Sequence, residues 1–133
     1  MDNPGVFVLA ALAITTPLTA QAQSPIVDLD GISAANLLCE MVGGTGGTSV
    51  DVLVQTTFDG GNTWLDVAHF SFTNTAGKKF ATLNALASKG VTAYAALAAE
   101  GVNDGLLGDQ LRGVITSVGT YTNTTVALHV HAK

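Results

Sequence analysis

The stretch "VDVLVQTTFDGGNTWLDVAHFSFT" (Val50 to Thr73) decides the fold class of this 133-residue chain. In its first part, Val50, Val52 and Val54 recur at every second position. A period of two is typical of half-buried β-strands, whereas helices repeat about every 3.6 residues. The glycines in "DGG" can adopt positive φ angles, so they favour a tight turn in the middle of the stretch. We therefore expect a β-hairpin here.

The same pattern extends over the rest of the chain. In "TVALHVH" (Thr125 to His131), Val126, Leu128 and Val130 again alternate with other residues. Clusters of Gly, Asn and Asp separate such segments about every ten residues, a spacing that predicts a β-sandwich or jelly roll. The expected strands lie near residues 6–15, 25–29, 35–42, 49–58, 64–73, 79–83, 91–98, 110–118 and 124–131.

We therefore expect an all-β fold, an antiparallel, jelly-roll-like β-sandwich of about eight or nine short strands. Its length fits a single domain over residues 1–133. Two segments, "ISAANLLCEM" (32–41) and "FATLNALAS" (80–88), are short-helix alternatives by propensity. The only cysteine, Cys39, lies in an apolar run. We expect it to be a small buried residue, since no intrachain disulfide can form.

Charged residues are scarce in this chain. They make up 11% of the sequence, against about 25% in ordinary soluble domains, while 47% of the residues are hydrophobic. So few charges favour self-association, so we expect part of the surface to be buried against other copies or a larger partner. Seven acidic residues and no Lys or Arg occur before Lys78, which argues against nucleic acid and anionic membranes as partners.

The N-terminal stretch "VFVLAALAITTPLTAQAQS" (Val6 to Ser24) resembles a secretory leader. It lacks the basic residues that precede the apolar run of a signal peptide. It is also too short, and too interrupted by Thr and Pro17, for a transmembrane helix. We expect a retained structural segment, with residues 1–14 as an extended arm or edge strand. A leader cleaved near Ala22 is the alternative.

The spacing Thr57-x-Asp59-x-Gly61-x-x-Trp64 resembles the Asp-box hairpin of sialidases and other β-propellers. In those proteins the box is a structural turn that occurs in several copies, and the chain here has one copy. A propeller needs at least about four blades of four strands, so a single box does not predict one. The resemblance implies a turn-forming role for the four residues. Calcium or sugar binding at the tip is the alternative.

A wider resemblance includes this hairpin and the closing segment "DQLRGVITSVGTYTNTTVALHVHAK" (109–133). Together they look like small β-sandwich proteins of tailed-phage virions. That family implies a head decoration (cement) protein on the outer surface of the capsid, with the major capsid protein and other copies, as a homotrimer, for partners. A tail or fibre component is the alternative within the family. The interface residues expected on this basis are Val6, Phe7, Val8, Leu9 and Arg112.

Histidines give a weaker signal for a metal site. His129 and His131 lie two residues apart on one expected strand face, a spacing that can place two imidazoles on one ion, and His69 is the only other histidine. An exposed or interfacial strand face is the simpler interpretation, so we expect no metal or other cofactor. The loop "GGTGGTS" (43–49) lacks the ending of a phosphate-binding loop, so we expect a hairpin loop there.

The segment "EGVNDGLLGD" (100–109) contains Glu100, Asn103, Asp104 and Asp109, whose oxygens suit calcium. Its spacing does not match an EF-hand, so we expect a surface loop in which Asp104 or Asp109 pairs with Arg112.

No nucleophile elbow or paired-carboxylate motif occurs, so we do not expect an enzyme. An active site would need His69, or the two C-terminal histidines, to line a pocket with carboxylates. An exported carbohydrate-binding module is the other alternative, with Trp64, Tyr94 and Tyr121 as the residues that would stack on sugars.

Overall fold

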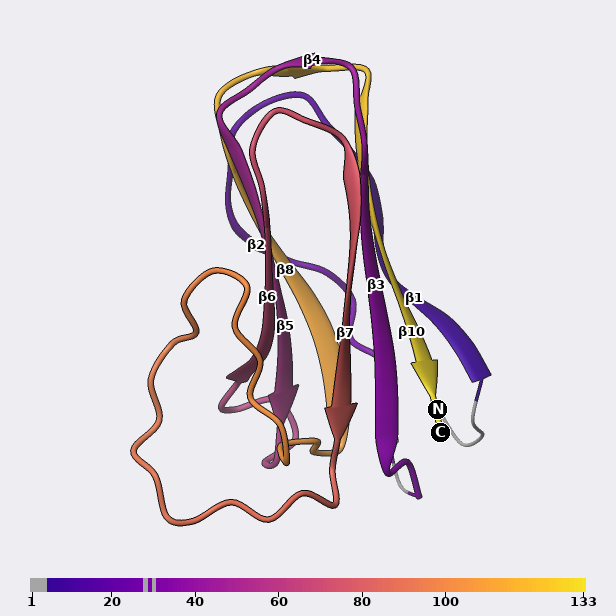
Figure 1. Cartoon of the computed structure of the whole chain (residues 1–133), viewed down its shortest axis with the longest axis vertical. Helices are drawn as coiled ribbons and strands as arrows, with labels where there is room; N and C mark the ends of the chain where they lie inside the picture. Colours follow the sequence, from indigo (N-terminus) through magenta and orange to yellow (C-terminus); the bar gives the residue numbers. More distant parts are fainter. Residues whose placement is uncertain (1–4, 28, 30) are drawn as a thin grey trace.

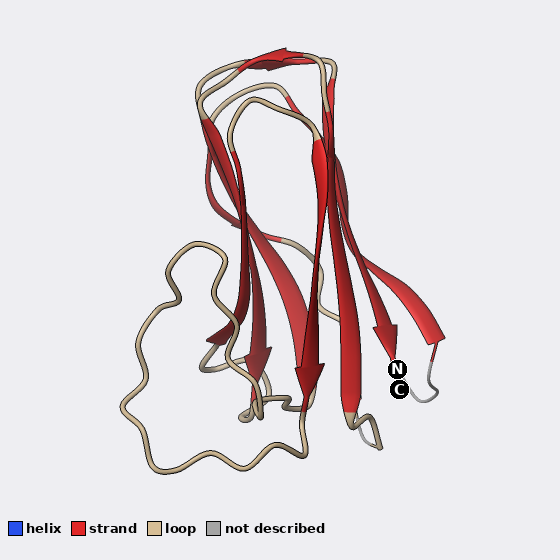
Figure 2. Cartoon of the chain, in the orientation of Figure 1, coloured by secondary structure: helices blue, strands red, loops and turns tan. Residues whose placement is uncertain are grey.

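A computed structural model describes residues 5–27, 29 and 31–133 of the chain, and its regular elements are all strands (Figures 1 and 2). The strands are β1 (Gly5–Ile14), β2 (Leu18–Ala22), β3 (Ala34–Val42), β4 (Thr45–Gly46), β5 (Ser49–Thr57), β6 (Leu65–Phe72), β7 (Gly77–Asn84), β8 (Gln110–Val118), β9 (Tyr121–Thr122) and β10 (Thr124–Ala132). The predicted all-β fold is confirmed.

Two antiparallel sheets of four strands form the body of the molecule (Figure 1). Sheet A has the order β1-β10-β3-β7 and sheet B the order β2-β8-β5-β6, while β4 and β9 pair separately at one end. The pairs β5–β6, β3–β7, β2–β8 and β1–β10 are nested, as if one long hairpin had been rolled up. The sandwich is therefore jelly-roll-like, and the turn between β5 and β6 is the tip of that hairpin.

The core lies between the sheets and follows from the alternation in the sequence. Val50, Val52 and Val54 on β5 are fully buried, and Leu128 on β10 faces them from sheet A. Cys39 on β3 is buried among these residues, as expected, and burial raises the pKa of its thiol to about 12. A thiol with so high a pKa stays protonated at neutral pH and contributes packing rather than reactivity.

Several boundaries differ from the expected ones. Both helix alternatives are wrong, because residues 32–41 lie largely in β3 and residues 80–88 begin in β7 and continue into a loop. The strand expected at 91–98 is also wrong, since these residues belong to a loop over 85–109. β2 was not expected, and from the predicted strand at 25–29 Ile26 forms only an isolated bridge with Leu111.

The loop over residues 85–109 stands beside sheet B as an open ring (Figure 1). Residues 88–96 are all exposed, whereas residues 97–103 return along the outer edge of β6. There, His69 N donates to Gly101 O at 3.0 Å, Glu100 N donates to His69 O at 2.8 Å and Asn103 N donates to Val67 O at 2.9 Å. The second half of the loop therefore satisfies the backbone of an edge strand that would otherwise be open.

Candidate functional site

The outer surface of sheet A carries an exposed apolar row between polar rows that include the Glu40–Lys78 pair. One row across all four strands consists of Val8, His129, Leu38 and Phe80, which are register partners on β1, β10, β3 and β7. Phe80 keeps 82% of its surface exposed, a large fraction for an aromatic residue that usually packs. We call this surface face A, with Val6, Val8, Leu38, Val42, Phe80, His129 and His131 as its members.

Face A is hollowed at its centre. A shallow depression of about 270 Å³ is lined by residues of β1, β3, β7 and β10, among them Val6, Leu38, Phe80 and the two C-terminal histidines. Exposed apolar surface around a depression marks sites of protein–protein contact in soluble proteins. The depression can therefore accept an apolar side chain of a partner.

The predicted interface residues on β1 divide between two sides of the strand. Val6 and Val8 point outward and are 69% and 55% exposed. Leu9 is buried in the core and Phe7 packs against the core from a half-buried position, because successive residues of a strand face opposite ways. The Leu9 side chain is therefore not available to an interface, whereas an interface role for Phe7 stays a prediction.

Arg112, the fifth predicted interface residue, lies on β8 in the other sheet. Its Nε donates to Gln55 Oε1 at 2.9 Å, and its guanidinium lies 4.1 Å from the centroid of the Trp64 ring. Gln55 Nε2 in turn donates to Asp66 Oδ1 at 2.8 Å. Burial lowers the pKa of Arg112. The expected ion pair with Asp104 or Asp109 is absent among the described residues, since Arg112 stacks on an aromatic ring instead.

The Asp-box residues make a turn that is held by its own side chains. Thr57 Oγ1 donates to Asp59 Oδ1 at 2.8 Å and accepts from Gly61 N at 3.0 Å, and Thr63 N donates to Asp59 Oδ1 at 2.8 Å. The Thr63 amide and the Thr57 hydroxyl stabilise the carboxylate and lower the pKa of Asp59. Gly61 has a φ of 101° and its α-carbon faces the Trp64 ring. Thr57, Asp59 and Gly61 therefore hold the turn, while the Trp64 ring lies beside Gly61 and stacks on Arg112.

The three histidines do not come together. His129 and His131 lie on face A, whereas His69 lies on the outer surface of sheet B, so the suggestion that His69 approaches them is wrong. Among residues 5–27, 29 and 31–133, no three His, Cys, Asp or Glu side chains are grouped so that they could hold one metal ion.

His69 instead connects the long loop to sheet B. Its Nε2 lies 2.9 Å from Asp51 Oδ1 and its Nδ1 lies 3.0 Å from Leu97 O. Both partners are acceptors, so only the doubly protonated ring can donate to both. Burial alone would lower the pKa of His69, but the hydrogen bonds to Asp51 and Leu97 outweigh it and raise that pKa above 6.5. Neither ring nitrogen is left free to take a proton from a substrate.

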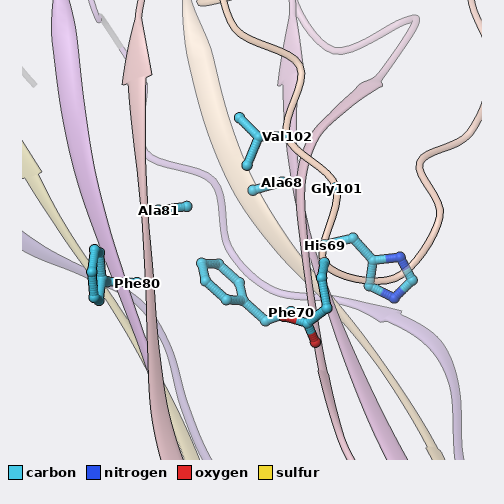
Figure 3. A pocket seen from close by; sticks show the side chains of 8 residues that line it. Ala68, His69, Phe70, Phe80, Ala81, Gly101 and Val102 are labelled. Atoms are coloured by element: carbon cyan, nitrogen blue, oxygen red, sulfur yellow. The ribbon is translucent and has the colours of Figure 1, made fainter.

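A small cavity of about 50 Å³ adjoins this histidine and is lined in part by Phe70, Glu100 and Val102. Figure 3 shows the His69 ring pointing away from Phe70 and Phe80. Glu100 is bonded as well, since its Oε1 accepts from Lys79 Nζ at 2.7 Å and from Ser71 N at 3.1 Å. The cavity is therefore large enough for only a few waters, and the hydrogen-bonded His69 and Glu100 do not meet in it as a free base and acid.

The calcium donors expected in residues 100–109 have separate tasks. Asn103 Nδ2 donates to Asp66 O at 2.9 Å, and Asp104 Oδ1 accepts from Gly105 N at 3.2 Å. With Glu100 bonded to Lys79, these side chains hold the loop in place.

The three aromatic residues proposed to stack on sugars do not form a platform. Tyr121 is 3% exposed and its hydroxyl donates to Thr73 O at 2.8 Å, so it is a buried residue. A methyl group at Gly47 would lie 2.0 Å from the Tyr121 ring, which explains why a glycine of the 43–49 loop packs there. Tyr94 accepts from Asp66 N at 3.0 Å, and Trp64 is stacked against Arg112.

Sequence reasoning missed Leu38, Val42 and Phe80 as members of the candidate interface. The available signal was a pair of consecutive apolar residues in a strand, because neighbouring side chains point to opposite faces. In β3, Leu37 faces the core and Leu38 faces solvent. An outward apolar residue on a strand is a surface feature that alternation alone does not reveal.

No family model, curated protein or solved structure matches this chain. A proposal about its function must therefore come from the surfaces and side chains described above. In the part of the chain that the structure describes, no helix is long and apolar enough to cross a membrane.

Proposed function

We propose that this chain is a structural, non-enzymatic protein of a phage virion that decorates the outside of the capsid and stabilises the head. The observation that carries the proposal is face A, where one row with exposed Val8, Leu38 and Phe80 crosses all four strands of sheet A in a chain with 11% charged residues. The major capsid protein is the proposed partner. The trimer expected from the family resemblance remains a prediction.

The two outer surfaces of the sandwich differ in a way that supports this orientation. On sheet B, the long loop runs along β6, and the side chains of Arg112, Gln55 and Asp66 are hydrogen-bonded to one another. On sheet A, the exposed row ends in Phe80 and no described segment covers it. We therefore propose that face A meets the capsid and that the loop side faces outward.

The proposed mechanism is mechanical. At about 25 cal/mol per Å², covering about 100 Å² of apolar surface contributes roughly 2.5 kcal/mol. Part of this offsets the entropy lost on docking, so one contact alone is weak. When each copy bridges neighbouring capsid subunits, the contacts act together and resist expansion of the shell. The side chains of His69 and Glu100 are already hydrogen-bonded within the protein, which supports a non-enzymatic role.

The test uses phage particles that lack this protein, with purified chain added back. Wild type should restore resistance to heat and to low salt, and Phe80→Asp should bind poorly because it places a charge in the apolar contact. The matched control is Val118→Asp, on β8 at the outer surface of sheet B, where the valine is 51% exposed.

Equal binding by both variants would refute face A as the docking surface. Particles with intact heads but missing tails, when the protein is absent, would place it in the tail instead.

A further inference from the structure

We propose that the outer edge of β1 is a pairing site for β1 of a second copy, so that two molecules share one continuous sheet. This inference does not depend on the capsid, since it concerns the protein in solution. It comes from a comparison of the four edges of the two main sheets, of which β1 is the least protected by the described residues.

The edge at β6 is covered by the chain itself. Residues 97–103 follow it through backbone hydrogen bonds at His69 and Val67, and Ala68 forms a bridge with Val102. A covered edge cannot add a further strand.

The edge at β7 carries positive charge and is tied to its neighbours. Lys78 lies 3.9 Å from Glu40, while Lys79 donates to Glu100 and to the Ser71 backbone carbonyl. Lysines on an edge strand oppose pairing, because joining another strand would require removing their charge from water.

The edge at β2 is short and irregular. Its register with β8 shifts between Leu18 and Gln21, and Ala20 has a φ of 43°, which an L-residue adopts only at a cost. Pro17 comes immediately before the strand. A bulged five-residue strand offers little straight backbone for a partner.

The edge at β1 has none of these protections except one bulge. The strand runs for ten residues, "GVFVLAALAI", without a charge or a proline. It pairs with β10 on one side, and no described strand pairs with its other side. The register shift between Val8 and Ala10 divides β1 into two parts, and both stay in register with β10 along their length.

A second copy fits this edge better than an unrelated strand. Antiparallel pairing of β1 with itself follows automatically from a two-fold axis, and the same groups meet on both sides of it. No charged residue lies in β1, so the two copies do not repel each other at the joint. Val6 and Val8 point to the same surface as the rest of face A, so the shared sheet would extend face A from one molecule onto the next.

The first test compares two substitutions on the same surface. Val8→Lys places a charge on the edge strand, whereas Val42→Lys places one on β3, an interior strand of sheet A. The two valines are 55% and 52% exposed, so their effects on folding should be similar. Sedimentation velocity of the full chain up to about 1 mM should show a dimer for wild type and for Val42→Lys. Val8→Lys should raise the dissociation constant by about tenfold or more.

The second test maps the pairing. In a Cys39→Ser background, single cysteines replace Val6, Val8, Ala11 or Ala13, the exposed residues of β1. Disulfides usually join α-carbons about 4.4–6.8 Å apart, so only the position nearest the two-fold axis should cross-link readily. The yield should fall on both sides of that position.

Three results would overturn this inference. They are a wild-type monomer at every concentration, an equal loss of dimer in both lysine variants, and a threefold assembly without β1 cross-links. Because Phe80→Asp tests capsid docking and Val8→Lys tests edge pairing, failure of one proposal is distinguishable from failure of the other.

Discussion

Replacing Thr57 by valine should destabilise the whole sandwich, because this residue holds the tip of the β5–β6 hairpin. The Thr57 side chain is fully buried and is almost the same size and shape as valine. The substitution therefore removes the hydroxyl while it leaves the packing nearly unchanged. Three hydrogen bonds are lost: those accepted from Gly61 N, at 3.0 Å, and from Asp59 N, at 3.4 Å, and the one donated to Asp59 Oδ1, at 2.8 Å.

The expected cost follows from these three bonds. Asp59 is exposed, so its carboxylate and its amide can bond to water instead, and we assign no cost to the loss of either bond. Gly61 N–H loses its partner in a half-buried place, and a net hydrogen bond of about 1 kcal/mol plus part of the desolvation penalty gives about 1–2 kcal/mol. For a domain of this size, that corresponds to a fall of roughly 5 °C in Tm.

The assay is equilibrium unfolding in urea, followed by far-UV circular dichroism. Thr75→Val is the matched control, since Thr75 is an exposed threonine in the β6–β7 turn whose hydroxyl makes no hydrogen bond to the described residues. The control should change the free energy of unfolding by less than about 0.5 kcal/mol. If the two variants are equally stable, the side-chain bonds of Thr57 do not hold the turn.

His69→Gln should flatten the pH dependence of Tm. The pKa of His69 is higher in the folded state than in the unfolded state, so protonation of His69 stabilises the fold fully below about pH 6.5, and this contribution is lost as the pH rises through the folded-state pKa. A variant with the wild-type pH profile would contradict this. Leu128→Ala should lower the free energy of unfolding by about 2–5 kcal/mol in urea titrations, since Leu128 is fully buried between the sheets. Arg112→Ala should alter the emission of Trp64, the only tryptophan, with a loss of no more than about 1 kcal/mol of stability; an unchanged spectrum would argue against the stacked pair.

Much of the sandwich was predictable because β3, β5, β8 and β10 each bury one face. In such strands the apolar residues alternate with other residues, and the apolar positions show which side faces the core. The segment at 91–98 misled for a physical reason: "VTAYAALA" has β-compatible residues, but its alanines are too small to bury enough surface to hold a strand. β2 escaped notice because "LTAQA" is mostly exposed and has no alternating apolar side.

The candidate interface was only partly predictable. The apolar run at Val6 to Leu9 pointed to β1, but both phases of that strand are apolar, so the sequence did not say which side faces out. Phe80 looked like an ordinary strand residue, and its exposure depends on its place on an outer surface. The hydrogen bond between His69 and Leu97 joins a strand to a loop residue 28 positions later. The loop has no hydrophobic periodicity, so no local sequence pattern predicts this contact.

The nested pairing of strands has a consequence for how the chain reaches its native state. The β5–β6 pair needs only the closure of a short turn, whereas the β1–β10 pair joins residues at opposite ends of the sequence, such as Gly5 and Ala132. Pairings between such distant segments are the slowest to form, since their loop-closure entropy must be met first. β1 should therefore be the last strand to dock during folding and the first to detach. Exchange of this strand between molecules would then give intertwined dimers at high concentration during refolding.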